Sequence, residues 1–149
     1  MRILHITATH LNPNGGVPVV LERLVTYQNQ NKNVKAQVIS LKAKINNIDS
    51  PYFEAVNLKK CEDYIIDFKP NCIILHSFFY IEYVVVMRII KKLNIPYYIE
   101  PHGSFGKAAM KKSAFKKNVA NRTIFKRLIE GAKGYVFLNQ TEYEDSVFH

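Results

Sequence analysis

Two histidines stand where short apolar runs of the sequence stop. His76 follows the run Ile73–Leu75 and precedes Ser77, and His102 closely follows a second run that ends at Glu100. A single histidine after a buried strand is more often a structural residue than a catalytic one. Two histidines at corresponding strand ends favour a functional site, because imidazole is the side chain best suited to acid–base and hydrogen-bond chemistry near neutral pH.

The second of these segments is a turn as well as the end of a strand. Pro101 has no backbone N–H, and Gly103 permits dihedral angles that other residues avoid. We therefore expect the strand to end at Glu100 and to place His102 and Ser104 on a sharp loop at its carboxyl end. In an open α/β sheet, ligands bind at that edge.

A pair of glycines, Gly15 and Gly16, precedes the first predicted helix. Glycines let a backbone approach a ligand closely, and a helix N-terminus offers free N–H groups and partial positive charge, so the site suits a phosphate. The alternative is a flexible turn. Neither the Gly-x-Gly-x-x-Gly dinucleotide pattern nor a P-loop is present in the sequence.

Other kinds of site lack support in the residue pattern. No carboxylate or cysteine spacing accompanies the histidines, so we predict no metal, and no Ser-His-Asp order or nucleophile elbow occurs. The two cysteines, Cys61 and Cys72, fit neither a zinc pattern nor a disulfide framework.

Strands and helices alternate along the chain. Hydrophobic periodicity predicts strands at 2–8, 34–41, 72–75, 95–100 and 134–138, with a short one at 52–56. It predicts helices at 17–30, 59–68, 79–93 and 111–131, and a last helix capped by Thr141 with Glu144 completing a capping box. This order predicts an α/β fold, a three-layer Rossmann-like domain with a mainly parallel sheet.

Composition and charge narrow the class of protein. The 149 residues are 48% hydrophobic and 22% charged, which is typical of one globular domain. No run approaches the roughly 18 apolar residues of a membrane span, and the apolar N-terminus is too short for a signal peptide. We therefore expect a cytoplasmic protein.

The net charge of +9 is concentrated in one segment. Eight basic residues and no acid lie between Lys107 and Arg127: Lys107, Lys111, Lys112, Lys116, Lys117, Arg122, Lys126 and Arg127. One interpretation is the solvated face of a helix docked on the sheet. The other is a patch for anionic lipid head groups, formed by Lys111, Lys112, Lys116 and Lys117 in particular. A nucleic-acid interface is less favoured, because no recognisable binding motif is present.

The order of these motifs resembles the N-terminal domain of family-4, or group 1, glycosyltransferases of the GT-B fold. The similar segments span essentially the whole chain: 1–6, 13–17, 69–77, 99–104, the basic helix and 132–142. The Pro101-His102-Gly103-Ser104 form looks most like members that assemble bacterial polysaccharides.

The resemblance implies a retaining enzyme that moves a sugar from a nucleotide-sugar to a glycan or lipid-linked acceptor. It implies that residues 1–149 form the acceptor-side domain, and that a C-terminal nucleotide-sugar domain is absent from this chain. His102 would contact the transferred sugar as the catalytic residue. The substrate-binding residues would be Gly15, Gly16, His76, Ser77, Gly103 and Ser104, without a metal or other cofactor.

A lipid-linked acceptor would place the enzyme at the inner face of the cell membrane, as a peripheral protein. Two alternatives come from other classes. One is a stand-alone basic α/β module that binds membrane or nucleic acid, and the other is a different α/β enzyme with a phosphate ligand. A complete small α/β protein is also open as an alternative to the domain of a longer chain.

Overall fold

The centre of the molecule is a sheet of five parallel strands, in the order β3-β2-β1-β4-β5. In this computed structural model, residues 1–8, 15–42, 50–111 and 125–148 are described. The strands are β1 (Arg2–Thr7), β2 (Lys35–Ser40), β3 (Phe53–Ala55), β4 (Cys72–His76) and β5 (Tyr97–Glu100). This confirms the predicted Rossmann-like α/β fold.

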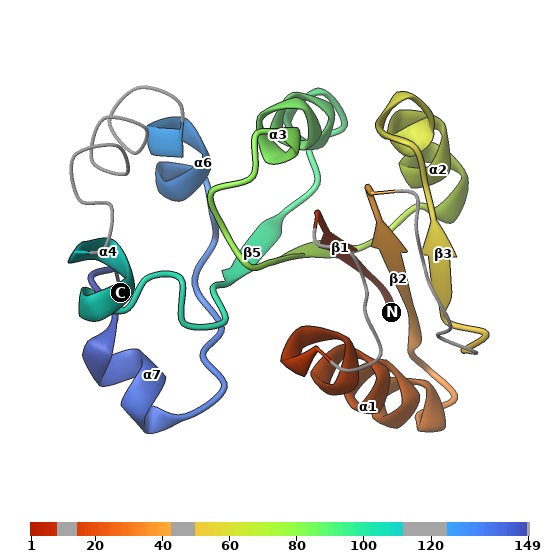
Figure 1. Ribbon diagram of the computed structural model, residues 1–149. Helices are drawn as coiled ribbons and strands as arrows, with labels where there is room; N and C mark the ends of the chain where they lie inside the picture. Colours follow the sequence, from red (N-terminus) through yellow and green to blue (C-terminus); the bar gives the residue numbers. More distant parts are fainter. Residues whose placement is uncertain (9–14, 43–49, 112–124, 149) are drawn as a thin grey trace.

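Helices cover both faces of the sheet (Figure 1). On one face lie α2 (Cys61–Phe68), α3 (Glu82–Lys92) and α6 (Lys126–Glu130), with the 3₁₀ turn η1 (Leu58–Lys60) before α2. On the other lie α1 (Gly16–Gln30) and α7 (Gln140–Asp145), and α4 (Lys107–Lys111) lies beyond the β5 side. None of the helices in the described ranges is long and apolar enough to cross a bilayer.

The two faces of the sheet differ in chemistry because successive side chains of a strand point to opposite sides. Towards α2, α3 and α6 the sheet buries a large aliphatic core, which includes Leu4, Ile6 and Leu75. Towards α1 the apolar core is smaller, with Leu21 and Val25 of α1 packed on sheet residues that include Ile3, Ala36 and Val38. The same face carries five buried polar residues nearer the carboxyl edge: His5, Thr7, Ser40, His76 and Glu100.

The predicted strand at 134–138 is wrong. Tyr135 makes only an isolated parallel bridge with Ile99. Val136 donates to the Ile99 carbonyl at 2.9 Å, but the next free backbone donor on that side, the Leu138 N–H, bonds the Glu142 carboxylate at 2.8 Å instead. The segment therefore leaves the sheet before a sixth strand can form.

Two helix starts also differ from the prediction. The helix expected from residue 79 begins at Glu82, because Phe79 has φ +66°, outside the helical region. The last helix is capped by Asn139 rather than Thr141, and the Asn139 side chain accepts from the Glu142 N–H at 2.9 Å. Asparagine is a better N-cap than threonine, and its extended backbone suits that position.

The predicted basic helix at 111–131 lies partly outside the described residues. Its first residue, Lys111, is exposed at the end of α4, and its last turn is α6. Lys112, Lys116 and Lys117 fall in the range 112–124, which the structure does not describe.

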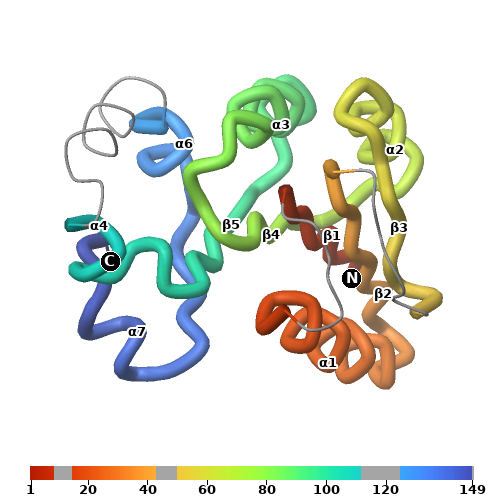
Figure 2. The backbone as a smooth tube through the Cα atoms, viewed as in Figure 1, coloured from red at the N-terminus to blue at the C-terminus, as the bar shows by residue number. Residues whose placement is uncertain are grey.

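The C-terminal segment returns to the carboxyl edge of the sheet. Figure 2 shows α4 and α7 side by side next to the chain that leaves β5. The Val147 N–H donates to the Phe105 carbonyl at 3.0 Å, and Gly106 forms an antiparallel bridge with Ser146. These contacts place α7 beside the turn that carries His102.

Candidate functional site

Strands β4 and β5 end side by side and deliver the two histidine segments to one place. Their register pairs His76 with Glu100, and the Ser77 N–H donates to the Glu100 carbonyl at 2.9 Å, one residue beyond the strand. His76 also pairs with Thr7 of the central strand β1. The approach of His76 to His102 follows from this register.

The backbone at this edge is strained. Ser77, Phe79 and His102 have positive φ, at +65°, +66° and +49°. Residues other than glycine rarely occupy this left-handed backbone region. Such residues cluster at functional sites, where surrounding contacts hold them in place. Gly103 follows at φ +74°, so the glycine predicted to shape this turn does adopt the left-handed conformation.

Hydrogen bonds of Ser104 and Gly103 hold the turn that carries His102. Ser104 donates to the Pro101 carbonyl through its N–H at 3.1 Å and through its hydroxyl at 2.6 Å. The Gly103 N–H donates to the Glu142 carboxylate of α7 at 2.5 Å. Glu142 also accepts from Leu138, so one side chain joins α7 to the His102 turn.

Three histidine rings form a hydrogen-bonded line across the sheet. The His5 Nδ1 to His76 Nε2 distance is 2.8 Å, and the His76 Nδ1 to His102 Nε2 distance is 2.9 Å. At the inner end, His5 Nε2 lies 2.9 Å from Oε1 of Gln28 on α1. We call Gln28, His5 and His76 the inner line.

The inner line has a fixed direction when its rings are neutral. Gln28 Oε1 can only accept, so His5 donates through Nε2 and is left with an accepting Nδ1. His76 then donates to it through Nε2, and its own Nδ1 accepts. His102 must therefore donate through Nε2.

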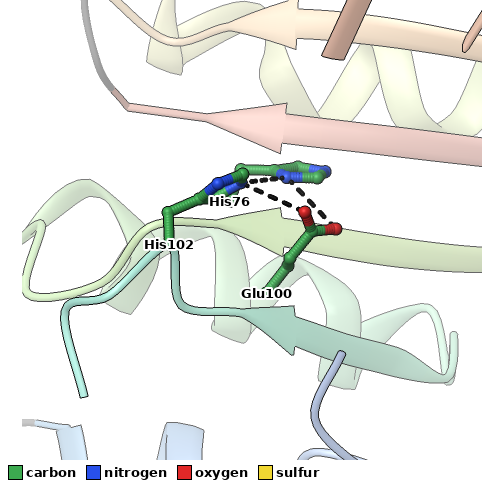
Figure 3. A group of neighbouring side chains, drawn as sticks. All are labelled: His76, Glu100 and His102. Atoms are coloured by element: carbon green, nitrogen blue, oxygen red, sulfur yellow. Dashed lines mark hydrogen bonds and ion pairs between the residues drawn. The ribbon is translucent and has the colours of Figure 1, made fainter. Parts of the chain in front are cut away.

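Glu100 lies beside the outer half of this line (Figure 3). Its Oε2 lies 3.6 Å from His76 Nδ1, and its Oε1 lies 3.3 Å from His102 Nε2. Oε1 is buried without a hydrogen-bond partner. The side chains of His76, Glu100 and His102 are 0%, 2% and 6% exposed, so any charge here is shielded from water.

Burial changes the pKa of every group in the cluster. It lowers the pKa of His5 to about 4 against the opposing effect of the Gln28 hydrogen bond, and it lowers the pKa of His76 well below its ordinary value. It also lowers the pKa of His102, although the Glu142 charge acts in the other direction. Burial, with a smaller effect of Glu142, raises the pKa of Glu100 to about 7.

His76, Glu100 and His102 are also the residues that could hold a metal. One ligand atom from each lies within 4.8 Å of the other two. The facing nitrogens of His76 and His102 are already joined by a hydrogen bond, so a metal would have to replace the shared proton. Their positions are therefore explained without a metal.

The remaining predicted residues lie near the same edge. Gly15 is the N-cap of α1, and a Cβ added to Gly16 would meet no atom of the described residues within 4 Å. Ser77 is buried, and Ser104 uses its hydroxyl within the turn. Their roles in binding stay predictions.

Sequence reasoning missed His5, Glu100 and Gln28 as members of the site. His5 and Glu100 had been assigned only to strands. A signal was present, since each is a polar residue within a short apolar strand, where an unpartnered polar group would be costly. Gln28 gave no comparable signal, because glutamine is ordinary on a helix surface.

Comparison with known proteins gives similarity of fold. No family model and no curated protein sequence matches the chain. Among solved structures, it is similar to UDP-GlcNAc 2-epimerase from Neisseria meningitidis bound to UDP-GlcNAc, with TM-score 0.60, 9% identity, and coverage of 97% of this chain and 42% of that chain. It is similar to the S. aureus MnaA–UDP co-structure, with TM-score 0.61, 13% identity and coverage of 97% and 40%.

A third similar structure is UDP-GlcNAc 2-epimerase from Methanocaldococcus jannaschii, with TM-score 0.57, 12% identity, and coverage of 97% of this chain and 41% of that chain. The chain thus spans about two fifths of the length of the solved structures it resembles. At these identities the similarity establishes a shared Rossmann-like fold.

Proposed function

We propose that this chain is the acceptor-side domain of a retaining glycosyltransferase. The enzyme would transfer a sugar from a nucleotide-sugar to a glycan or lipid-linked acceptor in the synthesis of cell-surface polysaccharide. The nucleotide-sugar would be held mainly by a second Rossmann-like domain. The observation that carries the proposal is the buried cluster of His76, Glu100 and His102, at the edge of the sheet where α/β folds bind ligands.

Two further findings support a sugar-nucleotide ligand. The N-terminus of α1 has no side-chain cap, and an uncapped helix N-terminus suits a phosphate group. The similar solved structures include proteins bound to UDP-GlcNAc and to UDP. Their low identity makes this support for the class of ligand rather than for a particular sugar.

His102 is the proposed catalytic residue. Its ring is hydrogen-bonded to His76, and Glu142 binds the N–H of the next residue, Gly103. These contacts hold His102 in its positive-φ conformation just beyond the end of β5. An imidazole there can hydrogen-bond a hydroxyl of the transferred sugar or stabilise charge near the reacting centre. Gly15, Gly16, His76, Ser77, Gly103 and Ser104 are proposed to line the substrate side.

A second candidate function is isomerisation of a nucleotide-sugar. Glu100 favours it, because burial raises its pKa to about 7, where a carboxyl group can give and take a proton at physiological pH. Such an enzyme would alter the sugar of the donor and need no acceptor. The stand-alone basic module, by contrast, has no use for a buried His–Glu cluster.

A transfer assay tests the proposal directly. The intact protein that carries this domain is incubated with a panel of labelled nucleotide-sugars and membrane lipid extract, and the products are separated. We expect labelled sugar in an acceptor fraction, and no transfer by residues 1–149 alone. A changed sugar still attached to its nucleotide, without acceptor labelling, would favour the isomerase instead. Transfer or donor hydrolysis by the 149 residues alone would contradict the two-domain division.

The same assay tests the role of His102. In the intact protein, His102→Ala should lower kcat by about 10² or more, the scale expected for losing one electrostatic stabiliser. The matched control is Gln30→Ala, an exposed residue at the end of α1. Thermal melting checks that both variants fold. Turnover of His102→Ala close to that of the unaltered protein would show that His102 is only structural.

A further inference from the structure

Glu100 is a carboxyl group in a place that does not suit an isolated charge. Its side chain is 2% exposed, and Oε1 lacks a hydrogen-bond partner. A buried carboxyl group of this kind must hold a proton or face a positive group. Among the described residues, the nearest group able to become positive is the His102 ring, whose Nε2 lies 3.3 Å from Oε1.

The inner line decides which nitrogen of His102 can take up a proton. Gln28 accepts from His5, His5 accepts from His76, and His76 accepts from His102. Neutral His102 therefore already carries a hydrogen on Nε2. Its Nδ1 is therefore the nitrogen that titrates. Among the residues that the structure describes, none forms a hydrogen bond with Nδ1, so this atom remains for a ligand.

We propose that Glu100 and His102 form a functional pair, in which the Glu100 carboxylate is the counter-charge of a His102 imidazolium and the inner line fixes the imidazole direction. Glu100 is then a positioning residue that acts through His102. The arrangement follows the general logic of a base oriented by a third group.

The pair can exchange one proton with a bound ligand. The Nδ1 lone pair of neutral His102 accepts the proton of a ligand hydroxyl, and the oxygen keeps the bonding electrons. His102 becomes an imidazolium, whose Nε2–H stays donated to His76 and whose positive charge lies beside ionised Glu100, with Nε2 3.3 Å from Oε1. Return of the proton from Nδ1 restores the starting state. The pair is a property of the folded chain, whereas its use in sugar transfer rests on the proposed function.

Among the residues that the structure describes, the other titratable groups around the pair are His5, His76 and Glu142. His5 on β1 and His76 on β4 stay neutral near physiological pH, since burial lowers the pKa of both. The negative charge of Glu142 on α7 raises the pKa of both groups, so it disfavours ionised Glu100 and favours protonated His102. Glu142 therefore favours a pair that takes up its first proton near neutral pH, whereas the neutral His5 and His76 add no charge beside it.

Nuclear magnetic resonance of the isotope-labelled chain tests the pair without any ligand. The ring nitrogens of His102 and the carboxyl carbon of Glu100 are followed between about pH 4.5 and 9. We expect Nε2 of His102 to be protonated throughout, and the His102 and Glu100 signals to share a midpoint near neutrality, since coupled groups titrate together. A Glu100 carboxyl that takes up the proton near neutrality while the His102 nitrogens do not change would overturn the proposal, because His102 would then never become the imidazolium.

Glu100→Gln supplies the second arm, because it keeps the shape and removes the charge. In this variant, His102 should no longer take up a proton near neutrality. Its titration midpoint should instead fall by about 1 pH unit or more, since the counter-charge is gone. An unchanged His102 titration would contradict the pairing. The wild-type carboxyl measurement decides the question even if this variant fails to fold.

Gln28→Ala tests the inner line, with Gln30→Ala as the matched control on the same helix. Without the Gln28 acceptor, His5 can carry its hydrogen on Nδ1 instead of Nε2, which reverses the hydrogen bonds along the line. Neutral His102 should then show a mixture of Nδ1–H and Nε2–H forms. The control should keep the Nε2–H form. An unmixed Nε2–H form in Gln28→Ala would overturn the role of the line.

The catalytic use of the pair has its own readout in the intact enzyme. Glu100→Gln should lower kcat by about tenfold or more with little change in KM, and the neutral inflection of the kcat–pH profile should disappear. A structural role alone would leave the inflection in place. If the resonance results hold but the intact protein transfers no sugar, the proposed function fails and the pair stands.

Discussion

Glu100 and His5 give the fold opposite dependences on pH. The folded state raises the pKa of Glu100 from 4.5 to about 7, so the stability from this group is complete below pH 4.5 and is lost as the pH rises to about 7. The folded state lowers the pKa of His5 from 6.5 to about 4, so its contribution is complete above pH 6.5 and is lost as the pH falls through about 4.

We therefore expect Glu100→Gln to stabilise the chain more at about pH 8 than at about pH 5. The uncharged amide avoids the cost of a buried carboxylate, and the difference between the two conditions should be at most about 3 kcal/mol. Urea denaturation at the two pH values measures it. Glu144→Gln is the control, because Glu144 is exposed on α7. Equal effects at both pH values would show that folding does not raise the pKa of Glu100.

At the scale of elements, α7 holds the His102 turn through Glu142. Glu142→Ala removes the acceptor of the Gly103 and Leu138 N–H groups, so we expect faster hydrogen exchange at both amides and a loss of stability of about 1 kcal/mol. Glu142→Gln should restore part of the protection, since an amide oxygen still accepts. Glu144→Ala, on the same helix, should change neither amide. Unchanged exchange at Gly103 in Glu142→Ala would mean that α7 does not hold the turn.

The basic segment is predicted to bind anionic lipid. We expect the chain to sediment with vesicles that contain acidic phospholipid but not with neutral ones. Binding should weaken as salt shortens the Debye length from about 10 Å at 0.1 M to about 3 Å at 1 M. A quadruple Lys→Gln variant at Lys111, Lys112, Lys116 and Lys117 should lose this binding with little change in thermal stability.

The control for that variant removes four exposed lysines elsewhere: Lys32, Lys59, Lys60 and Lys91. Both variants lose the same charge, so a general effect of net charge would weaken both equally. Binding lost only from the first variant locates the contact in the basic segment. If the unaltered chain ignores acidic vesicles at low salt, the segment is an ordinary solvated surface.

The elements with strong periodicity were the ones that the sequence predicted well. Strand β1, helix α1 and strand β4 lie within a residue or two of their expected positions, because each must bury an apolar face. The segment at 134–138 has the composition of a strand, but Glu142 takes its Leu138 donor. The competing acceptor is a side chain four residues further along the chain, and hydrophobic periodicity does not report such a competition.

The site was predictable to the extent that strand ends reveal it. The apolar runs before His76 and His102 indicated two strand ends on the same edge of a parallel sheet, and the structure shows that these strands are neighbours. The inner line could not be predicted, because it joins residues from α1, β1 and β4 through the register of the sheet. That His5 and His76 lie on the same face of the sheet can be seen only when that register is known.

At the scale of the whole molecule, the two faces of the sheet differ in composition. The face towards α2, α3 and α6 carries the larger apolar core, whereas the face towards α1 carries the buried polar residues. The larger core and the proposed site thus lie on opposite faces. The central claim is that the carboxyl edge of the α1 face binds a sugar ligand.

Ligand mapping by amide resonances tests that claim most directly. The labelled chain is titrated with a panel of nucleotide-sugars, nucleotides and oligosaccharides. We predict that at least one ligand shifts the amides of Gly16, Ser77, Gly103 and Ser104 together, and that His102→Ala weakens the binding at least several-fold. The amides of Asn71, Asn94 and Lys133, at the opposite edge of the sheet, should not move. Shifts confined to that opposite edge, or no shift with any sugar ligand, would contradict the account.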